Sequence, residues 1–323
     1  MDKNLSYYIH CFTHLKRDMK NGGAPHKPIL LLSVISMFEK GFFTDTQILI
    51  LPELVASFKA NWSKLVVTNH YPIFALPFYH LSSEPFWNLI PNVGCEKWIE
   101  SKNSMRSLGN LTTAVRYTLI DNELSDILRL SENRDILKIS ILDKYFSDTK
   151  SNLGSMSDDL PSVSILQDNS DEYKRKIIEL KNQVDENAFQ EEIFIRSGLF
   201  KREIPKVYNN TCAISGLRLT SVITNVSMVD ACHIVPFSES YDDTLTNGIA
   251  LCPNLHRAFD RGLISISDNY TVLINKTFVE DKNSAFRLSQ FEGQNIILPY
   301  SEELYPALEN LYKHRNKNGF SKL

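Results

Sequence analysis

Apolar positions along the first 150 residues recur mostly at helical spacing. The segments "HKPILLLSVISMFEKG" and "LPELVASFKANWSKLV" each predict one helix, and Gly41 is expected to end the first. Next, "IFALPFYHLSSEPFWNLI" mixes aromatic and β-branched residues with Pro and Ser breaks, which favours short strands and turns. From residue 110 to residue 146 the helical period returns. We therefore expect a mixed α and β region with a helical end.

The pattern breaks at residues 147–171. This stretch, "SDTKSNLGSMSDDLPSVSILQDNSD", is rich in Ser and Asp and keeps no sustained period, so we expect a linker. Residues 171–200 then place apolar side chains at helical spacing among many charges. This pattern predicts a connecting helix and a candidate dimer contact.

The third region predicts a strand, a loop and a helix in that order. "SMVDACHIV" is apolar and β-branched and should form a strand that ends at Pro236, whereas "ESYDDTLTNG" is rich in turn residues. "PNLHRAFDRG" predicts a short helix, because Pro suits a first helical turn and Gly a helix end. His256 and Asp260 are four residues apart and would share one face of this helix.

Composition limits the class of protein. A chain of 323 residues favours two domains, and 43% apolar with 23% charged residues is typical of a globular protein. No apolar run approaches the ~20 residues of a membrane helix, and the start lacks a signal-peptide pattern. The five cysteines are odd in number and scattered, which favours a reducing, cytoplasmic location.

Charge gives no sign of a basic domain. Net charge is −3 overall; residues 1–150 carry 17 Lys and Arg against 15 Asp and Glu, hence +2, and the remainder carries −5. A nucleic-acid surface would therefore have to be a local patch.

The strongest motif is "VDACHIVPFSESYDDTLTNGIALCPNLHRAFD". It runs from His233 over 14 residues to Asn247 and over 9 more to His256. In order, spacing and flanking words it resembles the HNH nucleases, and "NTCAISG" and the C-terminal tail extend the resemblance over about 190–323. The resemblance implies a ββα-metal fold that hydrolyses phosphodiester bonds with a divalent ion, Mg²⁺ or Mn²⁺.

The chemistry explains why these residue types are needed. A neutral imidazole can activate water near pH 7, so His233 is expected to be the general base. A cation must stabilise the charge of the transition state, and His256 is expected to be its first ligand. Asn247 is expected to fix the loop and orient His233 by hydrogen bonds. Asp260 either binds the metal or orients His256, although a structural role is an equal alternative.

Two departures from the family pattern concern metals. Relatives often carry Asp or His directly before the base as a second ligand; here Cys232 occupies that position, and Asp230 could substitute. Other HNH proteins hold a structural zinc with two CxxC pairs. Here Ser215 and Leu255 replace the second cysteine of each pair, so we expect no structural zinc.

Three short sequence motifs in the first 150 residues carry a second resemblance. "NGGAPHKPILLL", "YPIFALPFYHL" and "SMRSLGNLTTA" resemble the sulfur-binding domains of type IV, modification-dependent restriction endonucleases. The resemblance implies recognition of DNA in which sulfur replaces a non-bridging phosphate oxygen. The implied sulfur-pocket residues are Pro77, Phe78, Tyr79 and His80, with Tyr71 and Pro72 as a rival placement; the implied phosphate and base contacts are Arg106, Asn21, Gly22, Gly23, His26 and Lys27.

Together these patterns predict an α+β chain of two domains, a mixed α/β DNA-reading domain and a ββα-metal nuclease domain, joined by a linker and helix. The expected ranges are 1–150 for sulfur binding, 151–190 for the linker and connecting helix, and 191–323 for the nuclease. The expected partner is double-stranded, phosphorothioate-modified DNA, and a homodimer would supply two active sites. Two alternatives stay open: a reader of another modification such as a modified base, or an inactive DNA-binding regulator in which Cys232 cripples metal binding.

Overall fold

A computed structural model describes most of the chain. The described residues are 3–100, 105–153, 166, 171, 175–179, 186–219, 227–281 and 283–320. The chain divides into two compact units: unit 1 comprises residues 1–161 with 184–195, and unit 2 comprises residues 162–183 with 196–323. Most of the expected linker and much of the first half of the connecting helix lie outside the described residues.

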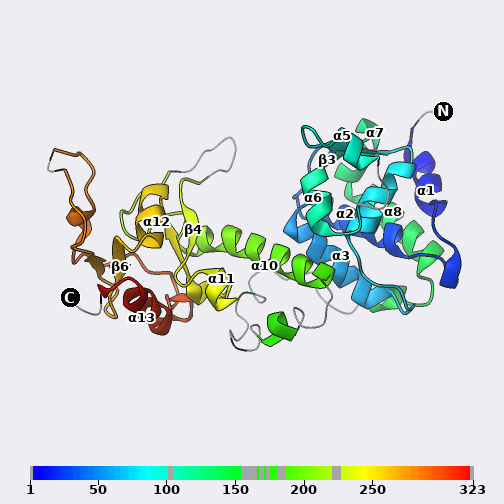
Figure 1. Ribbon diagram of the computed structural model, residues 1–323. Helices are drawn as coiled ribbons and strands as arrows, with labels where there is room; N and C mark the ends of the chain where they lie inside the picture. The colour runs from blue at the N-terminus through cyan, green and yellow to red at the C-terminus, as the bar shows by residue number, and fades with distance from the viewer. Residues whose placement is uncertain are drawn as a thin grey trace. The chain divides into compact units, whose positions relative to one another are not determined.

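Unit 1 combines helices with one small sheet (Figure 1). The strands β1 (Gln47–Ile48), β2 (Trp87–Pro91) and β3 (Val115–Ile120) pair antiparallel in the order β1-β3-β2. The helices are α1 (Leu5–Thr13), α2 (His26–Glu39), α3 (Pro52–Leu65), α4 (Ala75–His80), α5 (Glu96–Ile99), α6 (Leu108–Ala114), α7 (Asn122–Arg129) and α8 (Ser131–Tyr145), and short 3₁₀ turns are η1 (Lys20–Gly22), η2 (Leu81–Ser83) and η3 (Lys150–Leu153).

The core of unit 1 forms around α2. This helix is apolar on nearly all sides and buries eleven of its fourteen side chains, as expected of a central helix. Helix α4 adds Phe78, whose ring lies 5.6 Å from that of Phe74, and Trp87 packs edge-on against Phe78 at 5.3 Å. The Trp87 Nε1–H also donates to the Phe78 carbonyl at 2.9 Å, which ties α4 to the sheet.

The structure confirms some local predictions in unit 1 and corrects others. The two predicted helices are α2 and α3, and Gly41 follows α2 with φ +74°. The prediction of strands in "IFALPFYHLSS" is wrong, because this segment forms α4 and η2. The prediction that helices resume after residue 110 missed β3, which pairs with both other strands of the sheet.

Within the described part of residues 196–323, unit 2 contains two small antiparallel sheets and three further helices beside the end of α10 (Glu186–Val207). The strands β4 (Asp230–His233) and β5 (Gly248–Leu251) pair with each other, as do β6 (Ile264–Ile266) and β7 (Val272–Ile274). The remaining elements are α11 (Phe237–Ser240), η5 (Leu245–Asn247), α12 (Pro253–Asp260), η6 (Leu288–Phe291), η7 (Glu302–Leu304) and α13 (Leu308–Lys317).

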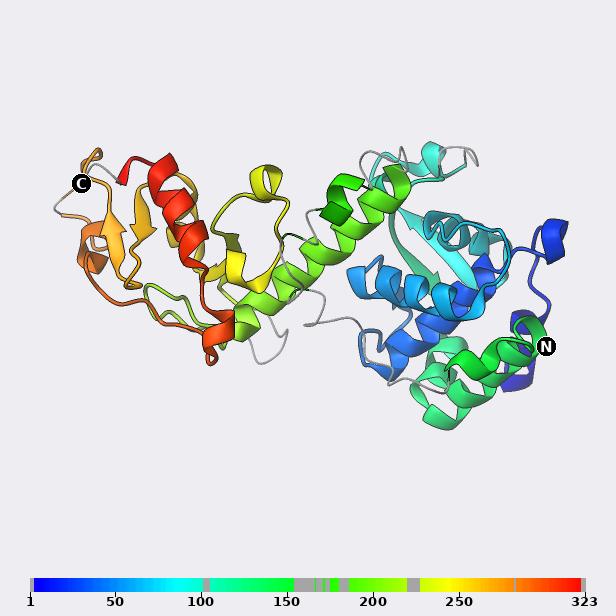
Figure 2. The same cartoon turned by 90° about the horizontal axis from the view of Figure 1, so that it is seen from below.

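The predicted strand, loop and helix are confirmed as β4, the loop to β5, and α12. Pro253 begins α12, and Gly262 follows it with φ +64°. A β-carbon at Gly262 would lie 2.2 Å from Asn318 Oδ1, so glycine lets the chain after α12 approach the end of α13 closely. Figure 2 shows α13, in red, beside the strands β6 and β7, and contacts between α13 and β6 agree with that view.

Among the described residues, no helix combines the length and the hydropathy needed to cross a bilayer.

Candidate functional site

His233 is held at the end of β4 by an acid and an aromatic ring. Its Nε2 lies 2.6 Å from Asp243 Oδ1, and the Asp243 side chain is fully buried. The Phe200 ring of α10 stacks on the imidazole with centroids 3.9 Å apart and planes 7° apart. These contacts leave the His233 side chain 22% exposed, so the ring is fixed on one side and open on another.

The contact with Asp243 decides which nitrogen of His233 can act as a base. A carboxylate only accepts hydrogen bonds, so Nε2 must carry the hydrogen and donate it. In a neutral imidazole the lone pair then belongs to Nδ1. The carboxylate would also stabilise an imidazolium if Nδ1 took up a proton. Asp243 was not predicted from the sequence, because a buried acid inside a turn-rich loop has no periodic signal.

Asn247 anchors the loop that carries Asp243. Its side chain is fully buried and accepts from the Val235 N–H at 3.0 Å. Its Nδ2 donates to the carbonyl oxygens of Val235 at 2.9 Å and Asp242 at 2.8 Å. The backbone carbonyl of Asn247 accepts from Ile234 N at 2.9 Å. Asn247 therefore joins the residues after His233 to the residue before Asp243.

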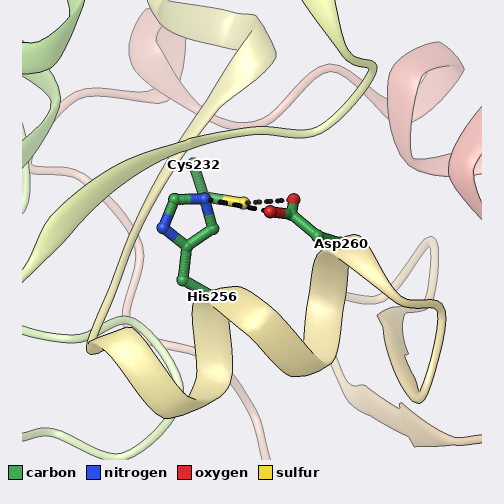
Figure 3. Close-up of side chains that lie close together, drawn as sticks. All are labelled: Cys232, His256 and Asp260. Carbon is green, nitrogen blue, oxygen red and sulfur yellow. Dashed lines mark hydrogen bonds and ion pairs between the residues drawn. The ribbon is translucent and has the colours of Figure 1, made fainter.

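A group of candidate metal ligands lies where β4 meets α12. Ligand atoms of Cys232, His256 and Asp260 all lie within 4.8 Å of one another, and Figure 3 shows their side chains converging. The Cys232 Sγ is 3.7 Å from Asp260 Oδ1, and His256 Nε2 is 3.4 Å from Asp260 Oδ2. Asp230 lies near the other nitrogen of the imidazole, with its Oδ2 3.7 Å from His256 Nδ1. We call Cys232, His256 and Asp260 the metal cluster.

The metal cluster fits a divalent cation. It offers one carboxylate, one imidazole and one thiol, which are side chains that bind such ions in proteins, and Asp230 adds a second carboxylate beside His256. Cys232 is fully buried, whereas the carboxylates of Asp230 and Asp260 are more than half exposed. Burial raises the pKa of the Cys232 thiol, and the neighbouring Asp260 carboxylate raises it further. Because the sequence prediction named Asp230 as the replacement for Cys232, it missed that the thiol itself belongs to the group.

A cavity of about 570 Å³ opens beside these residues. His233 and Asp260 both line it, so the expected base and one candidate ligand face a common space. Helix α13 lines the same cavity with Lys313 and Lys317. The cavity thus offers room for a substrate near the expected base, a candidate metal ligand and two cationic side chains.

The half-preserved zinc motif forms a buried pair of thiols instead. Ser215 N donates to Cys212 Sγ at 3.5 Å, and Ser215 Oγ lies 3.9 Å from Cys252 Sγ. A hydrogen bond from Cys252 lowers the pKa of Cys212, and Leu255 contributes only a buried apolar side chain. The expectation of no structural zinc stays a prediction.

Unit 1 has a basic opening of about 430 Å³. Four of the implied DNA-contact residues line it, two of them from the start of α2 and two from α4. These are His26, Lys27, Pro77 and His80; the other charged or histidine side chains of the lining are Lys16, Arg17, Asp18 and His70. The side chains of Lys16, Arg17 and Lys27 therefore share this lining with the carbons of Pro77 and Leu76.

Neighbouring groups fix the charge state and position of the cations in the basic opening. The Lys27 ammonium pairs with Glu84 at 2.6 Å, and burial lowers the pKa of Lys27 although this pair opposes the shift. Burial also lowers the pKa of His26 to about 4, and His26 Nε2 lies 2.8 Å from the Tyr71 carbonyl. His26 is therefore neutral near pH 7, and it acts as a hydrogen-bonding group rather than a cation.

Arg17 brings a guanidinium to the loop that contains Asn21 and Gly22. It donates to the Ala24 carbonyl at 3.1 Å and lies over the Tyr145 ring, 4.3 Å from the centroid. Gly23 has φ +87°, and a β-carbon there would lie 3.2 Å from Arg17 Nη2. The glycine thus makes room for the guanidinium. Arg17 was not predicted from the sequence, because it precedes the word "NGGAPHKPILLL" that carries the resemblance.

Other implied sulfur-pocket residues lie elsewhere. Phe78 and Tyr79 are 0% and 7% exposed, and neither lines the basic opening. Tyr71 and Pro72 are exposed and do not line the opening, and Arg106 is likewise exposed and outside its lining. Asn21 and Gly22 lie in η1, and Gly23 follows that turn.

Comparison with known proteins identifies one domain. Residues 212–267 match the model of a family described as HNH endonuclease. No curated protein sequence matches the chain. Among solved structures, the chain is similar to a "Modification dependent TagI restriction endonuclease", with 20% identity, 38% of each chain covered and a TM-score of 0.28. That TM-score is too low to indicate a shared fold. The matched segment contains His233, Asn247 and His256, so the chain contains an HNH endonuclease domain and these three residues lie within it.

Proposed function

We propose that the chain is a metal-dependent DNA endonuclease that recognises phosphorothioate-modified DNA and hydrolyses phosphodiester bonds near the modification. Such an enzyme would restrict modified foreign DNA. One observation carries the catalytic part: His233, oriented by Asp243, faces the same cavity as Asp260 of the metal cluster.

In the proposed reaction His233 activates the attacking water. Its Nδ1 accepts the proton from water while Nε2 keeps its hydrogen bond to Asp243. Phe200 holds the ring in plane, so the lone pair keeps one direction. Asn247 acts as a positioning residue, because its hydrogen bonds join the loop and strand on either side of this pair.

The metal cluster would hold the divalent ion through His256 and Asp260, with the Cys232 sulfur beside them, and we propose the nearby Asp230 as a further ligand. A bound ion would stabilise the negative charge that develops on the phosphate and on the leaving oxygen. Mg²⁺ and Mn²⁺ are the ions we expect. Oxygen ligands suit both, and a sulfur neighbour favours the softer Mn²⁺.

The basic opening of unit 1 is the proposed site for the modified phosphate. A phosphorothioate sulfur is more polarizable and more weakly hydrated than oxygen, so an apolar carbon surface favours it by dispersion and desolvation. Pro77 and Leu76 offer such carbons, and Arg17 and Lys16 offer charge for the remaining oxygens. Modified DNA would therefore bind where cations and a proline ring lie together.

Cleavage of phosphorothioated and plain plasmid, with Mg²⁺ or Mn²⁺, tests the proposal. We expect cleavage of the modified plasmid only, and no cleavage by His233→Ala. Equal cleavage of both plasmids would remove the sulfur claim while keeping the nuclease. Tight binding of modified DNA without cleavage in any metal would favour an inactive regulator instead.

Two further parts of the proposal need separate measurements. Gel shifts with oligonucleotides that differ in a single sulfur, or in its stereochemistry, test the reading of the modification. A modified base that binds as well as the phosphorothioate would refute it. Double-strand cleavage needs two active sites, so we propose a homodimer, and sedimentation of the full chain with and without DNA checks this.

A further inference from the structure

Helix α13 lies outside the matched HNH segment, yet it lines the cavity that contains the expected base. Four residues of this helix line the cavity: Asn310 and the residues three, four and seven positions after it, which are Lys313, His314 and Lys317. This spacing puts them on one helical face. We call the space between this face and the His233–Pro236 segment the α13 groove.

Two residues of α13 fix the helix against unit 2. His314 stacks on Phe259 at 3.8 Å, and its nitrogens lie 3.1 Å from the Phe259 carbonyl and 2.8 Å from Ser265 Oγ. Arg315 donates to the Ile266 carbonyl at 2.7 Å and pairs with Asp268 at 2.5 Å. Phe259 directly precedes Asp260, so the helix is anchored next to the metal cluster.

In the described part of the chain, the lysines of the groove pair with exposed carboxylates. Lys313 pairs with Glu309 at 2.5 Å, and Lys317 pairs with Glu239 of α11. All four of these side chains are about half exposed or more, so the pairs contribute little to stability and exchange readily. A phosphate can therefore replace either carboxylate at small cost. Lysine ammonium groups bind phosphate oxygens with up to three hydrogens.

We propose that the α13 groove binds the DNA backbone beside the scissile phosphate, with Lys313 and Lys317 as the phosphate contacts. The inference rests on the proposed function, because it takes DNA as the substrate of the site. His233 and Asp260 line the same cavity as the two lysines, so a strand whose phosphate meets the base would pass beside α13. Asn310 and Ser240, which also line the groove, offer neutral donors to the same backbone.

The test compares Lys313→Ala/Lys317→Ala with Lys206→Ala/Lys276→Ala. The control pair removes the same charge from exposed lysines of unit 2 that do not line the cavity. DNA binding is measured in a His233→Ala background, against salt concentration, with a phosphorothioated duplex. We expect the groove variant to bind roughly tenfold more weakly, with a log–log salt slope smaller by about 0.9 for each lost phosphate contact.

Single-turnover cleavage in the native background gives a second readout. The groove variant should need more DNA for half-maximal rate while its plateau rate stays near that of the native chain, and Lys→Arg at both positions should restore most of the affinity. Unchanged affinity and salt slope in the groove variant, or an equal loss in the control, would overturn the inference. If no DNA is cleaved by the native chain, the proposed function fails, whereas the binding measurement still decides the role of α13.

Discussion

Replacing Asn247 by Ala should destabilise the catalytic loop rather than remove a reacting group. The change leaves the Val235 N–H and the Asp242 carbonyl without their side-chain partner, whereas the Val235 carbonyl still accepts from Ser240 Oγ at 3.3 Å. Each buried group left unsatisfied costs about 1–3 kcal/mol, so the local free energy of unfolding should fall by roughly 2 kcal/mol or more. By the rule that about 1.4 kcal/mol is tenfold, amides of β4 and β5 should exchange about thirtyfold faster or more.

Hydrogen exchange is the suitable assay because unit 2 has no tryptophan. The three tryptophans are Trp62, Trp87 and Trp98, all in unit 1, so intrinsic tryptophan fluorescence would report only on that unit. Exchange at Ile234 and Val235 is followed by mass spectrometry in Asn247→Ala and in Asn254→Ala, which removes an exposed amide of α12. We expect protection to fall only in the first variant, with cleavage partly recovered at low temperature.

The opposite pattern would refute this reasoning. If Asn247→Ala abolished cleavage while exchange at β4 and β5 stayed native, Asn247 would contact the substrate or take part in the chemistry.

Four further outcomes are expected. Asp243→Asn should lower the single-turnover rate on the order of 10²- to 10⁴-fold, because a neutral amide no longer stabilises the His233 imidazolium, and adding His233→Ala should then lower the rate little further. Cys232→Asp should narrow any preference for Mn²⁺ over Mg²⁺ in calorimetric titrations, because oxygen replaces sulfur in the metal cluster. Burial lowers the pKa of His314 to about 4, so between about pH 6.5 and 4 this histidine binds a proton in the unfolded chain but not in the folded one. The free energy of unfolding should therefore fall on acidification through this range, by up to ~1.4 kcal/mol per pH unit. In His314→Asn, the hydrogen exchange of unit 2 amides should lose this pH dependence. Arg17→Ala should weaken binding of phosphorothioate oligonucleotides and reduce the salt slope by about 0.9, and an unchanged slope would contradict a phosphate contact.

The elements that were predicted correctly from the sequence are those whose structure is determined by residues close together in the chain. Helix α2 is a long apolar run with a glycine after it, and α12 begins with Pro253 and is followed closely by Gly262. The spacing of His233, Asn247 and His256 is likewise local, because a strand, one loop and one helix carry all three.

The secondary structure around Pro77 was predicted incorrectly, because the spacing of its apolar residues was read as that of strands rather than of a helix. A strand would have turned Pro77 and Tyr79 to the same side, whereas helix α4 turns Pro77 and His80 toward the opening and Phe78 toward Phe74. Six residues with a proline and several aromatics carry no clear period of either kind, so tertiary packing of the rings against Trp87 decided the helix.

Contacts between segments that are far apart in the sequence could not be predicted from local sequence patterns. Phe200 and His233 are 33 residues apart and stack face to face, and Arg17 reaches Tyr145 from the other end of unit 1. Such pairs depend on how helices and strands pack, which a single sequence does not encode in any short window.

The buried acid at position 243 also has an evolutionary consequence. Its Oδ1 serves His233, but its Oδ2 finds no hydrogen-bond partner among the described residues, and a buried oxygen in that state costs folding energy. Selection can retain such a costly group only while the reaction is useful. In a homologue that is no longer selected for catalysis, an apolar residue at this position would raise the free energy of unfolding. Position 243 should therefore distinguish working homologues from decayed ones that still keep their histidines.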